Sequence, residues 1–237
     1  MLDIEKLIKD YEPNEQAIEL VRSTKVVLLA GITGAGKDTI KKRLLKMPYF
    51  RDIVSHTTRL PRINNGKTEE NGVDYHFIDQ PTAMEMLQNR EFVEAKFVHG
   101  TIYGTSVAEI KLAYNQNKVA ITDIDVQGVA EYEKLSPCGI AIFIVPPTYQ
   151  TWIERLKKRY KTEADFQAEW PNRRKTSVKE LEHALEVPYY HIIINDDLDN
   201  AVQTCCEIIK RGDLFNARDD HARITARSLL NDLQKLV

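Results

Sequence analysis

A glycine-rich segment at residues 31–39, with the sequence GITGAGKDT, directly follows an apolar run at residues 25–30. The run is typical of a buried β-strand, and residues 37–46 have the pattern of a helix. Glycines allow consecutive backbone N–H groups to curl around an anion, and the N-terminus of the following helix adds partial positive charge. The strand, loop and helix together predict a phosphate-binding loop of the Walker A type within an α/β fold.

Apolar runs alternate with helical patterns along the rest of the chain. Further strands are expected at residues 119–123, 140–145 and 191–195, and helices after them at residues 126–135, 148–161 and 200–211. Strands made almost entirely of Val, Ile, Leu and Ala are typical of parallel sheets that are buried on both faces. The alternation therefore predicts a three-layer α/β core built on a parallel sheet.

Several segments stand outside this alternation and suggest a domain organisation. We expect a core at residues 25–51 and 118–211, an inserted small α+β lobe at residues 52–117, a helical lid at residues 157–179, and helical extensions at residues 1–24 and 212–237. The lid segment is rich in Lys, Arg and Glu and has no clear apolar stripe. The two extensions are expected to pack on the core, and homo-oligomerisation through them stays open.

The charge balance argues against several classes of function. Lys and Arg number 33 against 35 Asp and Glu, and this net charge of −2 argues against a protein that coats nucleic acid. The apolar runs are far shorter than the ~20 residues of a membrane span, and the N-terminus has no hydrophobic signal core. Cys138, Cys205 and Cys206 have neither disulfide nor zinc spacing, which favours ordinary packing. We therefore expect a cytoplasmic protein with no nucleic-acid or membrane partner.

The Walker A lysine is Lys37, which can reach the β and γ phosphates of a nucleotide and neutralise charge that builds up during transfer. The next position usually has Ser or Thr as a Mg²⁺ ligand, but here it is Asp38, followed by Thr39. Asp38 is favourable in a first helical turn for dipole reasons alone, and it is also a hard oxygen donor. We expect Asp38 to lie within metal distance, directly or through one water molecule.

Two further acids, Asp123 and Asp125, stand at the end of a predicted strand. Because they are two residues apart, they are expected to point to one face of the sheet. Asp123 fits the Walker B role of an acid that organises Mg²⁺ or its water shell, so the candidate metal-binding residues are Asp38, Thr39 and Asp123. The alternative for both acids is capping of the following helix.

The inserted lobe contains groups that suit a second anion. Arg59 and Arg62 lie three apart around a proline, and two guanidinium groups can clamp one phosphate. Downstream come the motifs DYHF at 74–77, FVEA at 92–95, YGTS at 103–106 and DIDVQG at 123–128. Taken singly, each motif has an ordinary explanation as surface or half-buried packing residues.

Together, and in this order behind a phosphate loop, these motifs resemble the guanylate kinase family over residues 26–199. The resemblance does not cover residues 1–24 or the chain after about residue 211. It implies a nucleoside monophosphate kinase of purine metabolism that transfers phosphate from ATP to GMP, and to dGMP, with Mg²⁺ as cofactor. The implied partners are these nucleotides.

The resemblance also implies a role for each matching residue of the lobe. Arg59, Arg62, Tyr75 and Tyr103 match positions that hold the GMP phosphate, and Ser55, Glu94, Thr105 and Asp125 match positions around the guanine. The chemistry agrees, because the guanine edge presents adjacent N1–H and N2–H₂ donors that a fixed carboxylate such as Glu94 accepts. A hydroxyl such as Ser55 or Thr105 can donate to O6. Adenine lacks both donors and would leave the carboxylate unpaired.

For ATP, the resemblance implies binding by the phosphate loop and by a segment beside the adenine. These residues are Gly31, Thr33, Gly34, Ala35, Gly36, Lys37, Asp38 and Thr39 of the loop, with Asn195 and Asp196 of the later segment. Lys37 and the lid arginines Arg155, Arg159 and Arg173 match the catalytic cations. The match loosens in the lid, where Tyr160 stands at a usual glycine and Arg174 at a common leucine. Arg173 and Arg174 therefore both stay candidates for the working residue.

Three other functions stay open. The GKDT ending also resembles the phosphate loop of ribose bisphosphate kinases, although these resemble the chain less around Glu94 and the DIDVQG motif. A guanylate-kinase-like module that binds partner proteins would have an eroded phosphate loop, whereas this chain keeps the glycines, Lys37 and the lid arginines. A P-loop ATPase that acts on protein or nucleic acid would not need Glu94 or the arginine pair.

Overall fold

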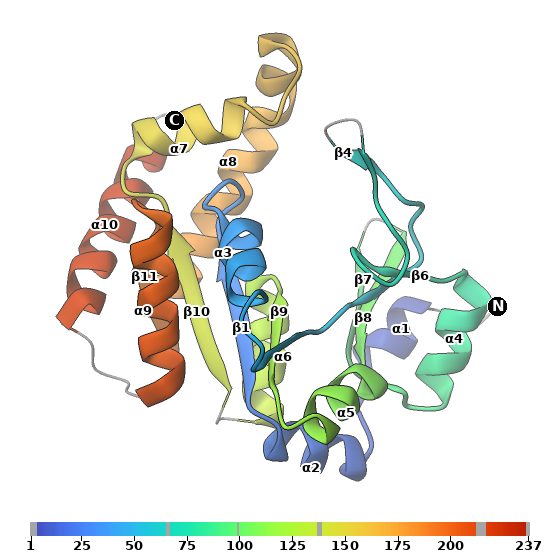
Figure 1. The fold of residues 1–237 in the computed structure, drawn as a ribbon. Helices are drawn as coiled ribbons and strands as arrows, with labels where there is room; N and C mark the ends of the chain where they lie inside the picture. Colours follow the sequence, from blue (N-terminus) through green and yellow to red (C-terminus); the bar gives the residue numbers. More distant parts are fainter. Residues whose placement is uncertain (1–3, 65–66, 99, 137–138, 212–216, 236–237) are drawn as a thin grey trace. The chain divides into compact units, whose positions relative to one another are not determined.

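The computed structural model describes residues 4–64, 67–98, 100–136, 139–211 and 217–235 (Figure 1). Cys138, residues 1–3 of the expected N-terminal extension, and residues 212–216 and 236–237 of the expected C-terminal extension lie outside this part. The chain forms two compact units. Unit 1 comprises Met1–Val26, Pro48–Thr122 and Glu131–Gly139, and unit 2 comprises Val27–Met47, Asp123–Ala130 and Ile140–Val237.

Unit 2 is built on parallel strands with fully buried faces. Strand β1 (Val26–Gly31) pairs with β10 (Ile140–Val145), and β10 pairs with β11 (Tyr190–Ile194); Leu29 is opposite Ile142, and Ile142 is opposite His191. Every residue of β1 and β10 is buried, as their Val, Ile and Leu content predicts. The strand order within unit 2 is therefore β11-β10-β1.

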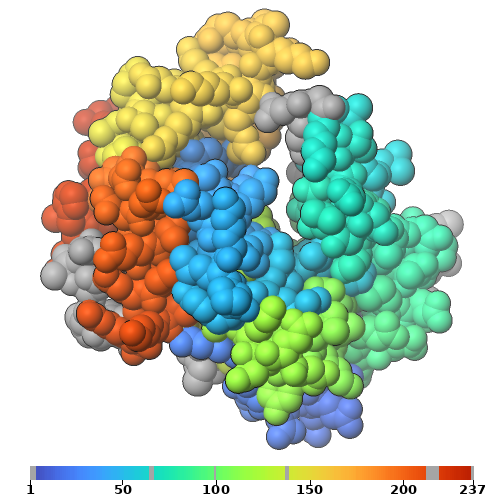
Figure 2. Space-filling view, in the orientation of Figure 1, coloured from blue at the N-terminus to red at the C-terminus, as the bar shows by residue number. Residues whose placement is uncertain are grey.

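Helices cover the strands of unit 2 on both sides. They are α3 (Lys37–Leu44), α7 (Tyr149–Lys157), α8 (Glu163–Glu186), α9 (Leu198–Arg211) and α10 (Ala217–Gln234). Helices α3 and α9 pack together in front of the strands, where Figure 2 shows them as adjoining blue and orange surfaces. Helix α10 packs against α8 and β11 on the other side (Figure 1). The fold of unit 2 therefore consists of a sheet between two helical layers.

Unit 1 contains a mostly antiparallel sheet with the strand order β6-β3-β8-β7. Its strands are β3 (His56–Thr57), β6 (His76–Phe77), β7 (Phe92–Val98) and β8 (Thr101–Ser106), and the short hairpin β4 (Ile63–Asn64) and β5 (Lys67–Thr68) extends from it. Strands β2 (Phe50–Asp52) and β9 (Val119–Asp123) pair in parallel. The helices are α1 (Ile4–Lys9), α2 (Glu15–Ser23), α4 (Gln80–Gln88) and α5 (Val107–Asn115). Helix α1 lies beside β7 and α4 (Figure 1).

The α/β class with a parallel sheet is confirmed, and all four strands expected for the core are present. The helices after them begin within two residues of the expected positions; α6 spans Val126–Leu135, as expected. The expected helix at residues 148–161 ends earlier, at Lys157, because the chain turns before α8 begins. The division into core, lobe, lid and extensions stays a prediction.

The segment without an apolar stripe forms most of the 24-residue helix α8, which sequence periodicity did not predict. Its start is fixed by a capping box, in which Thr162 and Asp165 bond each other's backbone N–H groups. Its buried residues are only Phe166, Ser177, Leu181 and Ala184, spread over 24 positions. A helix with so narrow a buried face gives little periodic signal.

Among the described helices, none is both long enough and apolar enough to cross a lipid bilayer.

Candidate active site

The phosphate loop of unit 2 depends on two glycines with positive φ. Gly31 has a φ of 141°, and a Cβ atom there would collide with the backbone oxygen of Ile144. Gly36 is left-handed, with a φ of 99°, and a Cβ atom there would collide with the side-chain amide of Asn195. Residues with a Cβ atom would be strained at both positions. The loop therefore approaches its neighbours more closely than other residues allow.

Lys37 is the first residue of α3 and points its ammonium group back over the loop. Its Nζ donates to the carbonyl oxygen of Gly31 at 2.5 Å. This contact holds the cation beside the start of α3, where the backbone N–H groups of the first helical turn also gather. The arrangement concentrates positive charge where a nucleotide phosphate is expected.

A cavity of about 580 Å³ brings most of the expected ATP-site residues together. It is lined by Thr33, Gly34, Gly36, Lys37, Asp38, Thr39, Arg155, Arg159, Asn195, Asp196 and Leu198. Gly31 and Ala35 are buried behind this lining. The volume lies within the ~300–1,000 Å³ range of small-molecule sites. Residues from the loop, α7 and the end of β11 thus share one site, although they are far apart in sequence.

Two hydrogen bonds fix the loop to the elements around it, and a third holds Arg155 to Asn195. The Asn195 side-chain nitrogen donates to the oxygen of Ala35 at 2.7 Å, and Arg155 donates to the oxygen of Asn195 at 2.8 Å. Trp152, which is fully buried in α7, donates from its indole nitrogen to the oxygen of Thr33 at 2.7 Å. Asn195 therefore supports the loop directly, and Arg155 is held at the mouth of the cavity.

Asp123, at the end of β9, pairs with a lysine that the sequence analysis did not single out. Its Oδ1 accepts from Lys41 Nζ at 2.8 Å, and 38% of its side chain stays exposed. Burial acts to raise the pKa of Asp123. The positive charge and hydrogen bond of Lys41, together with the charge of Lys37, outweigh burial, so the pKa of Asp123 is lowered. Asp123 is thus an ionised carboxylate beside the phosphate loop.

Asp125 lies in the turn before α6, and its side chain accepts from the backbone N–H of Gly128 at 2.8 Å. This contact is helix capping, which the sequence analysis gives as the alternative role of Asp125. A second role beside the acceptor base stays a prediction.

The lid arginines of unit 2 differ in their partners. Arg159 lies 4.0 Å from Asp38, and both are largely exposed. Arg173 donates to the hydroxyl of Tyr160 at 3.2 Å, whereas Arg174 donates to the backbone oxygen of Leu233 in α10 at 2.9 Å. The contact of Arg174 with the C-terminal helix favours Arg173 as the working lid residue.

Glu180 of α8 is a site residue that the sequence analysis missed. Its Oε2 is enclosed and has no hydrogen-bond partner among the described residues. Burial raises the pKa of Glu180 to about 7, with Lys37 and Arg173 acting to lower it and Asp125 acting to raise it. The carboxylate therefore feels the charge of Lys37, which also lines the cavity, although its sequence context shows only a long polar helix.

We expect the substitution Glu180→Gln to stabilise the fold above pH 7. A carboxyl group whose pKa is raised in the folded state binds extra protons there, so its contribution to stability falls as the pH rises from about 4.5 through 7. The gain at pH 8 should be on the order of 3 kcal/mol and should vanish below about pH 4.5. Urea titrations at pH 4.5 and 8 measure it, with the exposed Glu186→Gln as control. An equal gain at both pH values would contradict the prediction.

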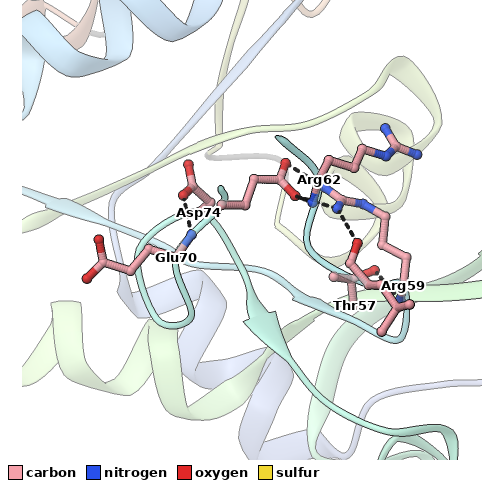
Figure 3. Close-up of polar contacts among 7 residues, drawn as sticks. Thr57, Arg59, Arg62, Glu70 and Asp74 are labelled. Atoms are coloured by element: carbon pink, nitrogen blue, oxygen red, sulfur yellow. Dashed lines mark hydrogen bonds and ion pairs between the residues drawn. The ribbon is translucent and has the colours of Figure 1, made fainter. Parts of the chain in front are cut away.

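In unit 1, Arg59 is held by an acid that the sequence analysis did not name. Glu69 accepts from Arg59 Nη1 at 2.5 Å and from Nη2 at 2.9 Å, and it also accepts from the backbone N–H of Arg62 at 2.8 Å. The hydrogen bond from Arg59 lowers the pKa of Glu69. Figure 3 shows Arg59 and Arg62 on one stretch of chain, with Asp74 and Glu70 on the loop beside them. Arg59 therefore contacts Glu69 through its guanidinium group and Arg62 through its backbone, so a clamp made of both guanidinium groups stays a prediction.

The two tyrosines expected beside the acceptor phosphate lie next to Arg59. The Arg59 guanidinium lies 4.8 Å from the centre of the Tyr75 ring, and the rings of Tyr75 and Tyr103 are 6.1 Å apart. Arg59, Tyr75 and Tyr103 therefore form one cationic and aromatic cluster, with the exposed Arg62 at its edge.

Of the residues expected around the guanine, Glu94 on β7 and Thr105 on β8 are buried, Ser55 before β3 is partly buried, and Asp125 is exposed in unit 2. Glu94 is 8% exposed and is opposite Thr105, which is fully buried. The hydroxyl groups of Ser55 and Thr105 are 3.5 Å apart. Tyr132 of α6 is 2% exposed, and the sequence analysis did not single it out. Burial is the main cause that raises the pKa of Tyr132, and the charge of Glu94 raises it further. A carboxylate and hydroxyl groups are thus gathered in one buried polar cluster.

The parallel sheet, the glycine loop and its lysine define a P-loop nucleotide-binding protein of the α/β class. The family model of guanylate kinase matches residues 23–212. Guanylate kinase from Sus scrofa is 34% identical over 182 residues, covering 76% of this chain and 88% of that protein. Guanylate kinase from Methylobacillus flagellatus is 33% identical, covering 77% and 87%. The chain belongs to the guanylate kinase family.

Two further comparisons agree with this family. Guanylate kinase 1 from Oryza sativa subsp. japonica is 35% identical over 201 residues, and the match spans 83% of this chain but about half (49%) of that protein. The crystal structure of guanylate kinase from Anaplasma phagocytophilum superposes with a TM-score of 0.60 at 22% identity, covering 82% of this chain and 89% of that one. This structural match supports the fold.

Proposed function

We propose that this protein transfers the γ-phosphate of ATP to GMP, giving ADP and GDP, and that it also accepts dGMP. The observation that carries the proposal is the buried Glu94 carboxylate beside Thr105, in a chain of the guanylate kinase family with an intact phosphate loop. A buried carboxylate needs donors, and the guanine edge supplies two. Adenine lacks both donors and would give the Glu94 carboxylate no hydrogen bond at this edge, so the site should discriminate against AMP.

The proposed chemistry is direct transfer between two bound nucleotides. An oxygen of the GMP phosphate attacks the γ-phosphorus, the new P–O bond forms, and the bond to the bridging oxygen breaks so that ADP leaves with the electron pair. Lys37, Arg155, Arg159 and Arg173 are the proposed cations that stabilise the charge on the transferring group. Arg59, Arg62, Tyr75 and Tyr103 are the proposed holders of the acceptor phosphate.

Magnesium is the proposed cofactor, and the chemistry of the available donors suits it. Asp38, Thr39 and Asp123 present only hard oxygen atoms, which Mg²⁺ prefers, and it usually takes one or two carboxylates plus substrate phosphates. When bound, the ion neutralises the β and γ oxygens. Lys41 already holds Asp123 in its ionised form. Metal binding by Asp38 would compete with its ion pair to Arg159.

An assay across acceptors tests the proposal. Purified protein with ATP and Mg²⁺ is given GMP, dGMP, AMP, UMP or ribose 1,5-bisphosphate, and the nucleotide products are separated by chromatography. We expect GDP and dGDP with at least about 100-fold preference over AMP. Turnover with the sugar phosphate alone would favour the related sugar kinases. Tight peptide binding without ATP binding would favour a protein-binding module.

The cellular setting follows from this activity as part of the same proposal. The enzyme would act in purine nucleotide metabolism in the cytoplasm, with GMP and ATP as its partners. Homo-oligomerisation through the terminal helices is tested by light scattering of the full chain and of the chain without its C-terminal extension.

A further inference from the structure

Tyr11 connects the N-terminal extension to the strand that carries Glu94. Its hydroxyl group donates to the backbone oxygen of Phe92 at 2.6 Å and accepts from the backbone N–H of Phe92 at 3.0 Å. One side chain therefore satisfies both backbone polar groups of a residue 81 positions away. Tyr11 precedes residues 23–212, the part that the family model matches.

Phe92 is the residue at which the pairing of β7 with β8 becomes irregular. Phe92 is opposite Ser106, but Glu94 is opposite Thr105, so one extra residue is accommodated between Phe92 and Glu94. Such a β-bulge redirects the side chains that follow it. The direction of the Glu94 carboxylate therefore depends on how the bulge is held, and Tyr11 binds the first residue of the bulge.

The rest of the extension packs around this contact. Ile4, Leu7 and Ile8 of α1 pack against the buried cluster formed by Ala83, Leu87, Phe92, Ala95 and Ile102. The Asn14 side chain, which caps α2, also donates to the backbone oxygen of Arg90 at 3.4 Å. The extension thus contacts the chain at two points just before Glu94.

The Tyr11 hydroxyl stays protonated at neutral pH. Burial raises the pKa of Tyr11 to about 12, against the effect of its hydrogen bond to Phe92. A neutral phenol donates one hydrogen bond and accepts another, which is the pattern that the Phe92 backbone requires.

We propose that the N-terminal segment at residues 4–14 is a positioning element of the acceptor-base site, in which Tyr11 fixes the β-bulge that directs Glu94. This inference rests on the proposed function, because it assigns to the extension the alignment of the proposed guanine acceptor. Tyr11 is a positioning residue that acts on Glu94 through Phe92.

The substitution Tyr11→Phe in the full-length protein tests the inference. It removes the hydroxyl group and keeps the ring. We expect KM for GMP to rise about tenfold, with kcat and KM for ATP within twofold of the wild type. The preference for GMP over IMP, measured as the ratio of kcat/KM values, should fall about fivefold, because IMP lacks the 2-amino group that a correctly directed Glu94 would bind.

The matched control is Tyr114→Phe, which removes a hydroxyl group from a tyrosine of α5 that is 51% exposed. All its kinetic values should stay within twofold of the wild type. Thermal unfolding and calorimetric binding of GMP without ATP accompany the kinetics, and a weaker GMP complex with a folded Tyr11→Phe protein supports the inference.

Three outcomes would overturn it in distinguishable ways. If the wild type makes GDP and Tyr11→Phe keeps the wild-type KM for GMP and preference over IMP, Tyr11 does not position Glu94, and the proposed function stands. If Tyr11→Phe raises KM for GMP and KM for ATP by similar factors, Tyr11 has only a general structural role. If the folded wild type makes no GDP, the proposed function fails, and this inference fails with it.

Discussion

Replacement of Lys37 by Met should lower kcat for GDP formation at least about 1000-fold. The Lys37 ammonium group lines the proposed ATP cavity and lies over the phosphate loop, 2.5 Å from the Gly31 oxygen. In transfer between two anions it would offset charge that builds up on the γ-phosphoryl group, and removal of one such preorganised donor costs about 10²–10³-fold in rate. A further loss is expected because Lys37 also holds the ground-state phosphates. Steady-state kinetics with saturating GMP measures the effect.

The matched control for this change lies on the same helix. Lys42 is exposed on α3 and does not line the cavity, so Lys42→Met should keep the wild-type rate within about twofold. Circular dichroism and thermal unfolding should show that both variants are folded. If folded Lys37→Met retained a tenth or more of the wild-type rate, the proposed role of the phosphate loop in transfer would be wrong.

The substitution Glu94→Gln should lower kcat/KM for GMP by about 10²–10³-fold and leave KM for ATP within about twofold. An amide has one acceptor oxygen and one donor group, so one of the two guanine donors would meet an N–H₂ group in a buried site. Glu94 is 8% exposed, and little solvent is available to relieve that mismatch. Discrimination between GMP and AMP should fall in parallel, because the carboxylate that accepts from guanine but not from adenine is gone.

A control for charge loss comes from the same unit. Glu85 is an exposed residue of α4, and Glu85→Gln changes the net charge by the same amount. Its kinetics should match the wild type. A similar loss for GMP and ATP in Glu94→Gln would show that Glu94 supports the fold, and the guanine assignment would then be incorrect.

The core elements could be predicted because their signals are local. Strands β1 and β10 consist almost wholly of Val, Ile, Leu and Ala, and every residue in them is buried. The glycines at 31 and 36 likewise report backbone conformations that only glycine adopts without strain. Strand β3, which has only two residues, escaped prediction, and the bounds of α8 could not be read within the expected helical segment at residues 157–179 because this helix buries few positions.

The polar partners of the site could not be predicted, because they depend on how a loop folds back on itself or come from distant parts of the chain. Nothing near Arg59 in the sequence identifies Glu69 as its partner over other acids of the same loop. The raised pKa of Glu180 depends on burial beside Lys37, which is 143 positions earlier in the chain. Burial and charge at such positions arise only when separate elements pack together.

The sequence alone determined the phosphate loop, the order of the core strands along the chain, and a set of candidate residues for two nucleotides. The loop and the strands follow from neighbouring residues, whose backbone and hydrophobic preferences act over a few positions, whereas the candidate residues follow from the resemblance of the motifs to guanylate kinases. The tertiary structure alone decided which side chains support the segments that carry the candidate residues. Examples are the hydrogen bonds from Tyr11 to the backbone of Phe92 and from Asn195 to the backbone of Ala35. Hydrogen bonds between groups 81 and 160 residues apart depend on the packed fold, because their geometry exists only after the chain has folded.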